Sequence, residues 1–137
     1  MSVEKSFVNP PGLFSTKGLG FTHVVTSAPG KTIHISGQTA WNAERELVGG
    51  DDLRRQATQA FDNLRKALGA AGATPRDVVF VRLYVVGYRP EYAGVLSPML
   101  EAFFAGGPPP GSTWIGVSAL AVPGFLIEIE ATAVVAA

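Results

Sequence analysis

The sharpest alternation of polar and apolar residues lies near the C-terminus, over residues 125–135. Because successive side chains of a strand point to opposite faces, this pattern predicts a strand with two different faces. One face is entirely apolar and is expected to join the core: Phe125, Ile127, Ile129, Ala131 and Ala133. The other face carries Glu128 and Glu130. Ionised carboxylates are seldom buried without partners, so this face is either the solvated side of a sheet or the floor of a cleft.

Two segments have apolar side chains at the spacings of three and four residues that are typical of an amphipathic helix. The first begins after Asp51 or Asp52, which is expected to cap it, and ends at Gly72. Its apolar stripe consists of Leu53, Ala57, Ala60, Phe61, Leu64, Ala67, Leu68 and Ala71. The second helix covers about residues 90–104, and Pro98 is expected to kink its middle.

Residues 78–86, between these two helices, predict a strand that is apolar on both faces. One face would carry Val79, Val81, Leu83 and Val85, and the other Val78, Phe80, Arg82 and Tyr84. A strand of this kind has to be covered on both sides. Two helices suffice for one face of such a sheet, so we expect another copy of the chain to cover the remaining face.

The other predicted strands cover residues 21–27, 32–36 and 112–118. A Pro29-Gly30 turn is expected to join the first two into a hairpin. The element order is then ββαβαββ, which indicates an α+β domain with both helices on one side of a mixed sheet. The length of 137 residues fits a single domain that spans residues 1–137.

Composition and charge narrow the classes of function. Hydrophobic residues make up 47% and charged residues 16%, with eleven basic and eleven acidic residues and no basic run, so nucleic-acid binding is not expected. There is no cysteine, and His23 and His34 lack a metal-ligand spacing, so neither a metal nor a cofactor is expected. Prolines interrupt the long uncharged stretch 105–127, which excludes it as a membrane helix. We expect a soluble cytoplasmic protein.

Several short motifs, in order, resemble those of the RidA/YjgF family. They are Ser-Gly-Gln at 36–38, Gln-Ala-Phe-Asp-Asn-Leu at 59–64, Leu-Gly-Ala-Ala-Gly at 68–72, Glu-Ala-Phe-Phe at 101–104 and Ile-Glu-Ile-Glu-Ala at 127–131. The resemblance runs from about residue 20 to residue 133 and implies a chorismate-mutase-like fold. It also implies a homotrimer with three small-molecule clefts between neighbouring subunits, so the partners expected are the chain itself and a small molecule.

The resemblance also assigns candidate site residues. Deaminases of that family hydrolyse reactive imines, and a glutamate equivalent to Glu128 positions or activates the attacking water. Their carboxylate-gripping arginine follows a Pro-Ala pair, and Ser112 stands in its place here. Phe21 stands where a pocket tyrosine is expected, and Ser97 where an asparagine is expected. The remaining candidate binding residues are Ser36, Gly37, Thr113 and Trp114.

The change at Ser112 weakens the expectation of ordinary deaminase chemistry. A serine hydroxyl has one donor and no charge, whereas arginine offers a rigid fork that matches a carboxylate. Removing one side of such a pair costs about 2–5 kcal/mol. Arg82 either binds the substrate carboxylate in place of the missing arginine, as a substitute clamp, or neutralises Glu128 and Glu130 between subunits. Trp114 belongs either to the interface or to the pocket.

Three functions follow as alternatives. The first is a RidA-family protein of unassigned substrate that binds a small molecule in the clefts between subunits. The second is an imine or enamine deaminase in which Ser112 and Thr113 bind a different substrate. The third, an endoribonuclease, is disfavoured by the absence of basic patches and of a catalytic histidine pair. A purely structural trimer is the further possibility that the sequence leaves open.

Overall fold

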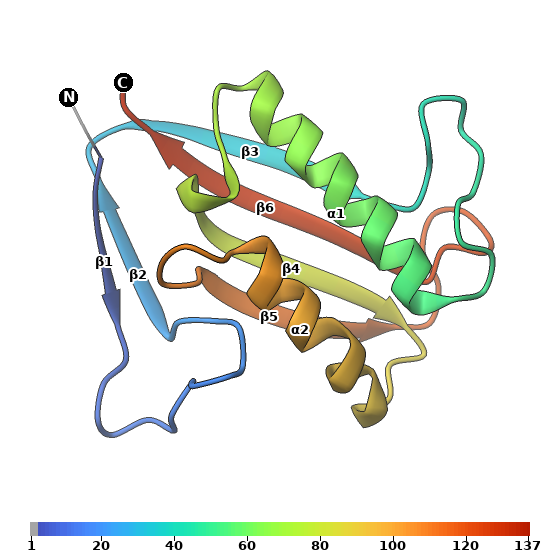
Figure 1. Ribbon diagram of the computed structural model, residues 1–137, viewed down its shortest axis with the longest axis horizontal. Helices are drawn as coiled ribbons and strands as arrows, with labels where there is room; N and C mark the ends of the chain where they lie inside the picture. Colours follow the sequence, from blue (N-terminus) through green and yellow to red (C-terminus); the bar gives the residue numbers. More distant parts are fainter. Residues whose placement is uncertain (1–2) are drawn as a thin grey trace.

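Two helices cover one face of a four-stranded sheet in the computed structural model, which describes residues 3–137 (Figure 1). The strand order is β3-β6-β4-β5; β6 is antiparallel to both its neighbours, and β4 and β5 are parallel. A separate antiparallel pair is formed by β1 and β2. The elements are β1 (Glu4–Val8), β2 (Val24–Ala28), β3 (Lys31–Gln38), α1 (Leu53–Ala70), β4 (Val78–Val86), α2 (Ala93–Phe103), β5 (Gly111–Val117) and β6 (Ile127–Val135). The predicted α+β class, with both helices on one side of a mixed sheet, is confirmed.

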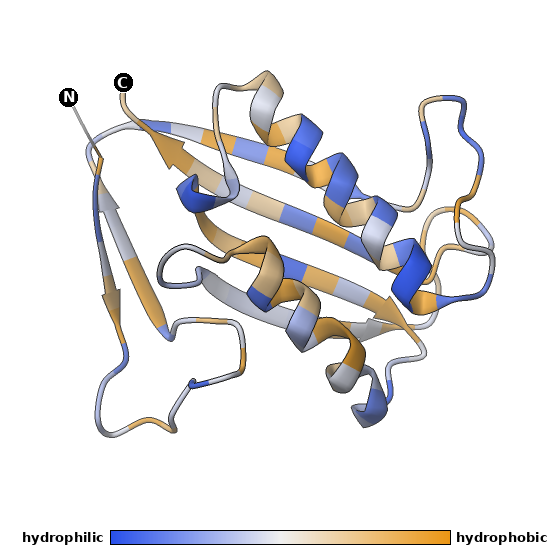
Figure 2. Ribbon diagram, in the orientation of Figure 1, coloured by the Kyte–Doolittle hydropathy of each residue, from blue (hydrophilic) through white to orange (hydrophobic). Residues whose placement is uncertain are grey.

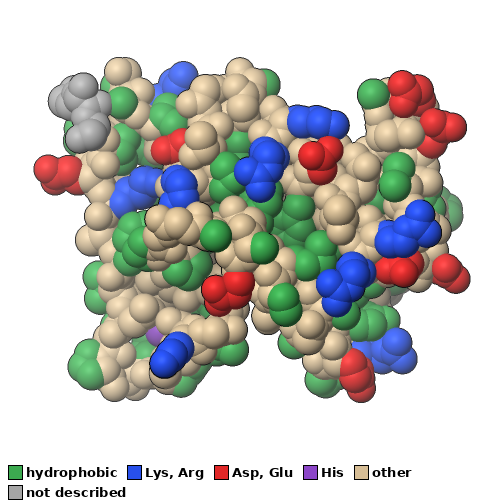
Figure 3. All heavy atoms as spheres, in the orientation of Figure 1, with side chains coloured by type: hydrophobic (Ala, Val, Ile, Leu, Met, Phe, Trp, Pro, Cys, Tyr) green, Lys and Arg blue, Asp and Glu red, His purple; other side chains and the backbone are tan. Residues whose placement is uncertain are grey.

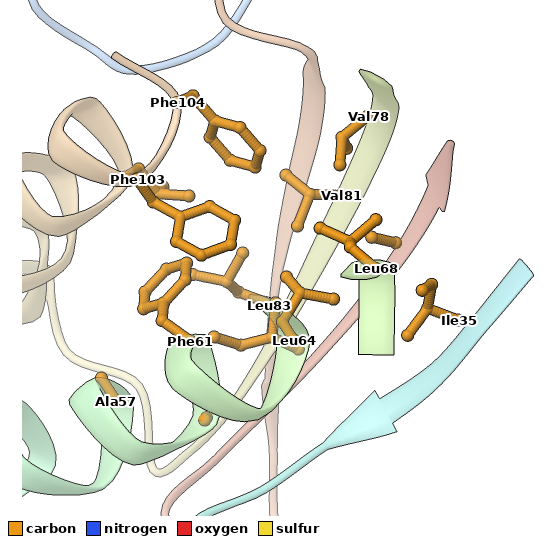
Figure 4. Packing of buried hydrophobic residues seen from close by; sticks show 14 of the residues in the cluster. Ile35, Ala57, Phe61, Leu64, Leu68, Val78, Val81, Leu83, Phe103 and Phe104 are labelled. Atoms are coloured by element: carbon orange, nitrogen blue, oxygen red, sulfur yellow. The ribbon is translucent and has the colours of Figure 1, made fainter. Parts of the chain in front are cut away.

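The core lies between the helices and the sheet. The apolar face predicted for β6 is confirmed, since Ile127 and Ile129 have no exposed area; the alternation along this strand is visible in Figure 2. Burying an aliphatic side chain of this size stabilises the fold by about 1.5–3 kcal/mol. Phe61 of α1 and Phe103 of α2 meet above the sheet with ring centroids 4.9 Å apart (Figure 4). One hydrophobic cluster thus joins both helices to the sheet.

Both helices lie close to their predicted positions. Asp52 caps α1 by accepting a hydrogen bond from the backbone N–H of Arg55, 3.0 Å away. Gly72, with a φ of +77°, follows the end of α1. The segment before α2 is a short 3₁₀ helix, Pro90–Tyr92, and Pro98 lies inside α2. Proline has no N–H, so the Gly94 carbonyl loses its helical donor there.

The first two predicted strands do not form a hairpin with each other. The structure pairs β2 with β1, a strand that the sequence pattern did not predict, and pairs β3 with β6. The reason is burial: Ile33 and Ile35 of β3 enter the core, whereas no residue of β2 is fully buried. At the turn between them, Gly30 lies so close to β6 that a Cβ would be 2.5 Å from the Val135 carbonyl oxygen.

The faces predicted for β4 are wrong at its start, because a β-bulge interrupts the alternation there. The register between β4 and β6 shifts between Val78 and Phe80. As a result, Val78, 2% exposed, joins Val81 in the core, and Val79 is only half-buried. An extra residue in one strand reverses the alternation on one side of the bulge, which a strict two-residue period cannot anticipate.

A buried glutamine ties α1 to the start of β6. The Gln56 side chain has no exposed area. Its amide nitrogen donates to the Gly50 carbonyl at 2.6 Å and to the Gly124 carbonyl at 2.8 Å. Its oxygen accepts from the Leu126 backbone N–H at 2.9 Å. Buried polar groups have to be paired, so this one side chain satisfies three backbone groups and fixes the loop before β6 against the helix.

We therefore expect Gln56→Leu to lower the free energy of unfolding by about 3 kcal/mol or more, because it leaves two buried carbonyls and one N–H without partners. Urea unfolding measures this. Gln59→Leu, one turn further along α1, removes a single side-chain bond to Asn63 and is the matched control, with an expected loss below about 1 kcal/mol. Equal losses in the two variants would contradict the role assigned to Gln56.

Candidate functional site

A pocket of about 270 Å³ lies between the loop after β1, helix α2 and strand β5. Its lining is largely apolar with two hydroxyls: Leu19, Phe21, Ala93, Ser97, Ser112 and Trp114. Four of these six are candidate binding residues from the sequence, and Leu19 and Ala93 were not predicted. Leu19 could have been suspected as an apolar residue next to Gly20 and Phe21, whereas nothing in the pattern distinguishes Ala93.

Close contacts of the loop residues place Phe21 in this pocket. Gly20 has a φ of +80°, and a Cβ there would lie 3.3 Å from Leu100 Cβ, so only glycine lets the loop approach α2 this closely. Thr22 is buried, its backbone N–H donates to the Pro110 carbonyl at 2.9 Å, and its hydroxyl donates to the Pro109 carbonyl. The loop is therefore fastened both to α2 and to the segment that enters β5.

Strand β5 presents Ser112 and Trp114 on the helix side of the sheet. Their register partners on β4 are Val81 and Leu83, which are both fully buried in the core. The Ser112 Oγ is buried and, alone among such side-chain atoms within residues 3–137, has no hydrogen-bond partner. The Trp114 ring meets Tyr88 edge to face, with centroids 6.3 Å apart. Strand β5 thus gives the pocket an aromatic wall, Trp114, and an unsatisfied hydroxyl, Ser112 Oγ.

The remaining candidate residues lie on the opposite, open face of the sheet. Glu128 of β6 lies opposite Tyr84 of β4. Arg82 of β4 lies between Glu130 of β6 and Thr113 of β5, its register partners on the two neighbouring strands. Arg82 Nη1 lies 3.7 Å from Glu130 Oε1, and its guanidinium stacks over Phe80 at 4.8 Å. An exposed pair of this kind contributes at most about 1 kcal/mol.

The Tyr84 hydroxyl also donates to Glu130. This hydrogen bond to a carboxylate, with a smaller contribution from desolvation, raises the pKa of Tyr84 above its ordinary value. The phenol therefore remains a donor at neutral pH, and Glu130 is occupied within its own chain by both Tyr84 and Arg82.

Glu128 lies directly over Gly37 on the neighbouring strand. A Cβ at Gly37 would be 2.1 Å from Glu128 Oε2, so the carboxylate occupies the space that the missing side chain leaves. Ser36, the residue before Gly37, is exposed on β3. The structure therefore brings Gly37 and Glu128 together, and it separates them from Ser112 by the thickness of the sheet.

The chemistry available to one chain follows from this division. The pocket offers aromatic surface and two hydroxyls, but none of its lining residues is an acid or a base. General acid–base catalysis needs a titratable group within reach of the reacting atom. Glu128 is the candidate for that role, and it lies on the other face of the sheet.

The described residues show neither a cluster of metal-ligating side chains nor, on the helix face, a patch of one charge sign (Figure 3). Within residues 3–137, no three His, Asp or Glu side chains lie close enough together to hold a metal ion. His23, in the bend before β2, contacts the Phe14 carbonyl at 2.9 Å, whereas His34 lies on β3 of the four-stranded sheet. On the helix face, Lys and Arg side chains are interspersed with Asp and Glu (Figure 3). No helix within the described residues is long and apolar enough to cross a membrane.

The fold and the pocket define a small α+β protein with two helices packed on one face of a mixed sheet. The family model described as endoribonuclease L-PSP matches residues 18–135. The chain therefore belongs to the RidA/YjgF family.

Individual relatives agree with this assignment. The chain is 32% identical to the 2-iminobutanoate/2-iminopropanoate deaminase of Dermatophagoides farinae, over 77% of this chain and 80% of that protein. It is 29% identical to the RutC family protein YjgH of Escherichia coli, over 96% and 95% of the two proteins. A crystal structure of YyfB from Yersinia pestis, a Rid-family protein of unknown function, superposes with a TM-score of 0.92 at 46% identity, covering 95% of this chain and 98% of that one.

We expect Gly37→Ala to displace the Glu128 carboxylate, because the new Cβ would occupy the place of Oε2. The Glu side chain can change rotamer at a cost of about 1 kcal/mol, so the fold should persist. The carboxyl ¹³C signal of Glu128 in NMR spectra reports the displacement.

Gly94→Ala is the control, since a Cβ there meets nothing within 4 Å. It should leave the Glu128 signal in place and, as an alanine in a helix, stabilise the protein by about 0.5–1 kcal/mol. An unshifted Glu128 signal in Gly37→Ala would contradict the packing described.

Proposed function

We propose that this protein is a small-molecule-binding member of the RidA/YjgF family whose clefts are completed by a second copy of the chain, within a homotrimer. The observation that carries the proposal is the division of the candidate residues. Phe21, Ser97, Ser112 and Trp114 line a pocket on the helix side, whereas Gly37 and Glu128 lie on the open face. A second copy is the simplest way to bring a Glu128 carboxylate to a Ser112 pocket.

The open face has the character of a surface that another subunit covers. The helices lie on the other side of the sheet (Figure 1), and Phe80 and Tyr84 are only half-buried here. Arg82 and Glu130 are already paired, so covering this face would not isolate either of these two charges. These features support the homotrimer that the family resemblance implies.

Imine deamination by the usual route is disfavoured by three substitutions in the pocket. Ser112 replaces the carboxylate-gripping arginine, and Phe21 and Ser97 replace more polar residues. Glu128 is retained as the candidate that positions water. We therefore propose that the ligand differs from the small imino acids named for the Dermatophagoides relative.

The alternative is a deaminase that uses other groups. Thr113 and Ser112 point to opposite faces of the sheet, so they would bind one substrate only if different copies supplied them. The same holds for Arg82 as a substitute clamp, and it would first have to leave Glu130. The name of the deaminase relative favours keeping this alternative.

The first prediction from the proposal concerns assembly. Light scattering after gel filtration should give about three times the chain mass of 14.4 kDa, because residues 3–137 of one chain place no helix over the open sheet face. A monodisperse monomer would contradict both the trimer and the shared cleft.

The second prediction concerns catalysis. Ketoacid release from small imino acids that an amino-acid oxidase generates should be at least about thirtyfold slower than with an arginine-containing family member, as expected from the loss of one partner of an ion pair. Ser112→Arg should recover part of the rate, with Ser118→Arg on the exposed loop after β5 as control. Wild-type turnover equal to that of the arginine-containing enzyme would favour the alternative.

A further inference from the structure

We infer that the Ser112 pocket takes a charge-neutral ligand with a body of about one aromatic ring and one short polar group that hydrogen-bonds to Ser112 Oγ. This inference rests on the proposed function, since it names the ligand class of the same pocket. It excludes free carboxylates, the substrates that the family's arginine would hold.

Charge is the first argument. None of the residues that line the pocket is charged. A carboxylate that entered would lose its hydration without gaining a counter-ion, which costs far more than the burial of a neutral group. The uncharged lining therefore disfavours the binding of anionic ligands.

The neighbouring arginines are already engaged elsewhere. Arg76 donates to the Phe104 carbonyl at 2.6 Å and to the Pro108 carbonyl at 3.0 Å. Arg89 lies over the Tyr92 ring at 5.0 Å and donates to its hydroxyl at 3.1 Å. Arg82 is on the opposite face beside Glu130. A ligand carboxylate would have to break one of these interactions to acquire any of these three arginines as its cation.

The unpaired hydroxyl is the second argument. Ser112 Oγ is buried, lines the pocket and lacks a partner among residues 3–137. A buried polar atom without a hydrogen bond is costly, and a hydroxyl can both donate and accept. One ligand amide, hydroxyl or carbonyl group would satisfy it, which favours a ligand with a single polar end.

Shape and size give the third argument. Phe21 is held by edge contacts with Phe14 and His23, at centroid distances of 6.0 and 5.4 Å, and Trp114 by its contact with Tyr88. These contacts fix two aromatic walls. An engineered apolar cavity of about 150 Å³ holds benzene. A pocket of about 270 Å³ therefore admits one ring with a short substituent.

The test uses the purified oligomer of this chain and four matched probes: benzyl alcohol, benzamide, toluene and sodium benzoate. Isothermal titration should show that benzyl alcohol and benzamide bind at least about tenfold more tightly than benzoate, since the charged group has no partner. Ser112→Ala should weaken binding of benzyl alcohol and benzamide by about three- to tenfold and leave that of toluene unchanged, as expected for one lost hydrogen bond. Ser118→Ala, which alters an exposed serine outside the pocket, is the control and should change none of these affinities.

Preferential binding of benzoate would overturn the inference. Equal effects of Ser112→Ala on toluene and benzyl alcohol would also overturn it, because the hydroxyl would then not be the polar contact. Absence of binding by all neutral probes, in an oligomer that still binds benzoate, would refute the neutral-ligand class and leave standing the proposed small-molecule cleft that a second copy completes. A monomer that binds neither kind of ligand would refute the proposed function itself.

Discussion

The structure depends on the two different faces of β6. One face places Ile127 and Ile129 without exposed area beneath both helices, and this burial holds the helix layer on the sheet. The other face carries Glu128 and Glu130, which the same alternation forces away from the core. A strand with a purely apolar second face would not offer an acid on that surface. The fold and the candidate chemistry are therefore set by the same nine-residue segment.

The sheet that this strand organises also divides the site. Ser112 and Trp114 lie on the helix side of the sheet, as do their buried register partners on β4. Thr113 lies on the opposite face, which carries Glu128 and Glu130. The pocket beside Ser112 can enclose a ligand, whereas the group best suited to act on water lies on the far surface of the same chain. Assembly is therefore a chemical requirement of the proposal, since the lining of the Ser112 pocket contains no acid or base of its own chain.

Sequence reasoning predicted the features that depend on regular periods. The helices, the apolar face of β6 and the convergence of Phe21, Ser97, Ser112 and Trp114 follow from alternation, helical spacing and family motifs. It failed where a non-local or irregular contact decides. The bulge at Val78, the pairing of β2 with β1 and the three hydrogen bonds of Gln56 leave no periodic trace in the chain. The positions of Glu128 and Ser112 on opposite faces depend on sheet register, which the pattern of either strand alone does not reveal.

The shared cleft can be tested most directly by cross-linking between chains. The chain has no cysteine, so a thiol at position 97 in one variant and at position 128 in another would each be unique. The two variants would be unfolded, mixed and refolded into mixed oligomers, then treated with a short bismaleimide. The account predicts cross-links between a Ser97→Cys chain and a Glu128→Cys chain, because a pocket of one copy should face the acidic surface of the next. Mixed oligomers that form normally but yield no such cross-link would contradict it.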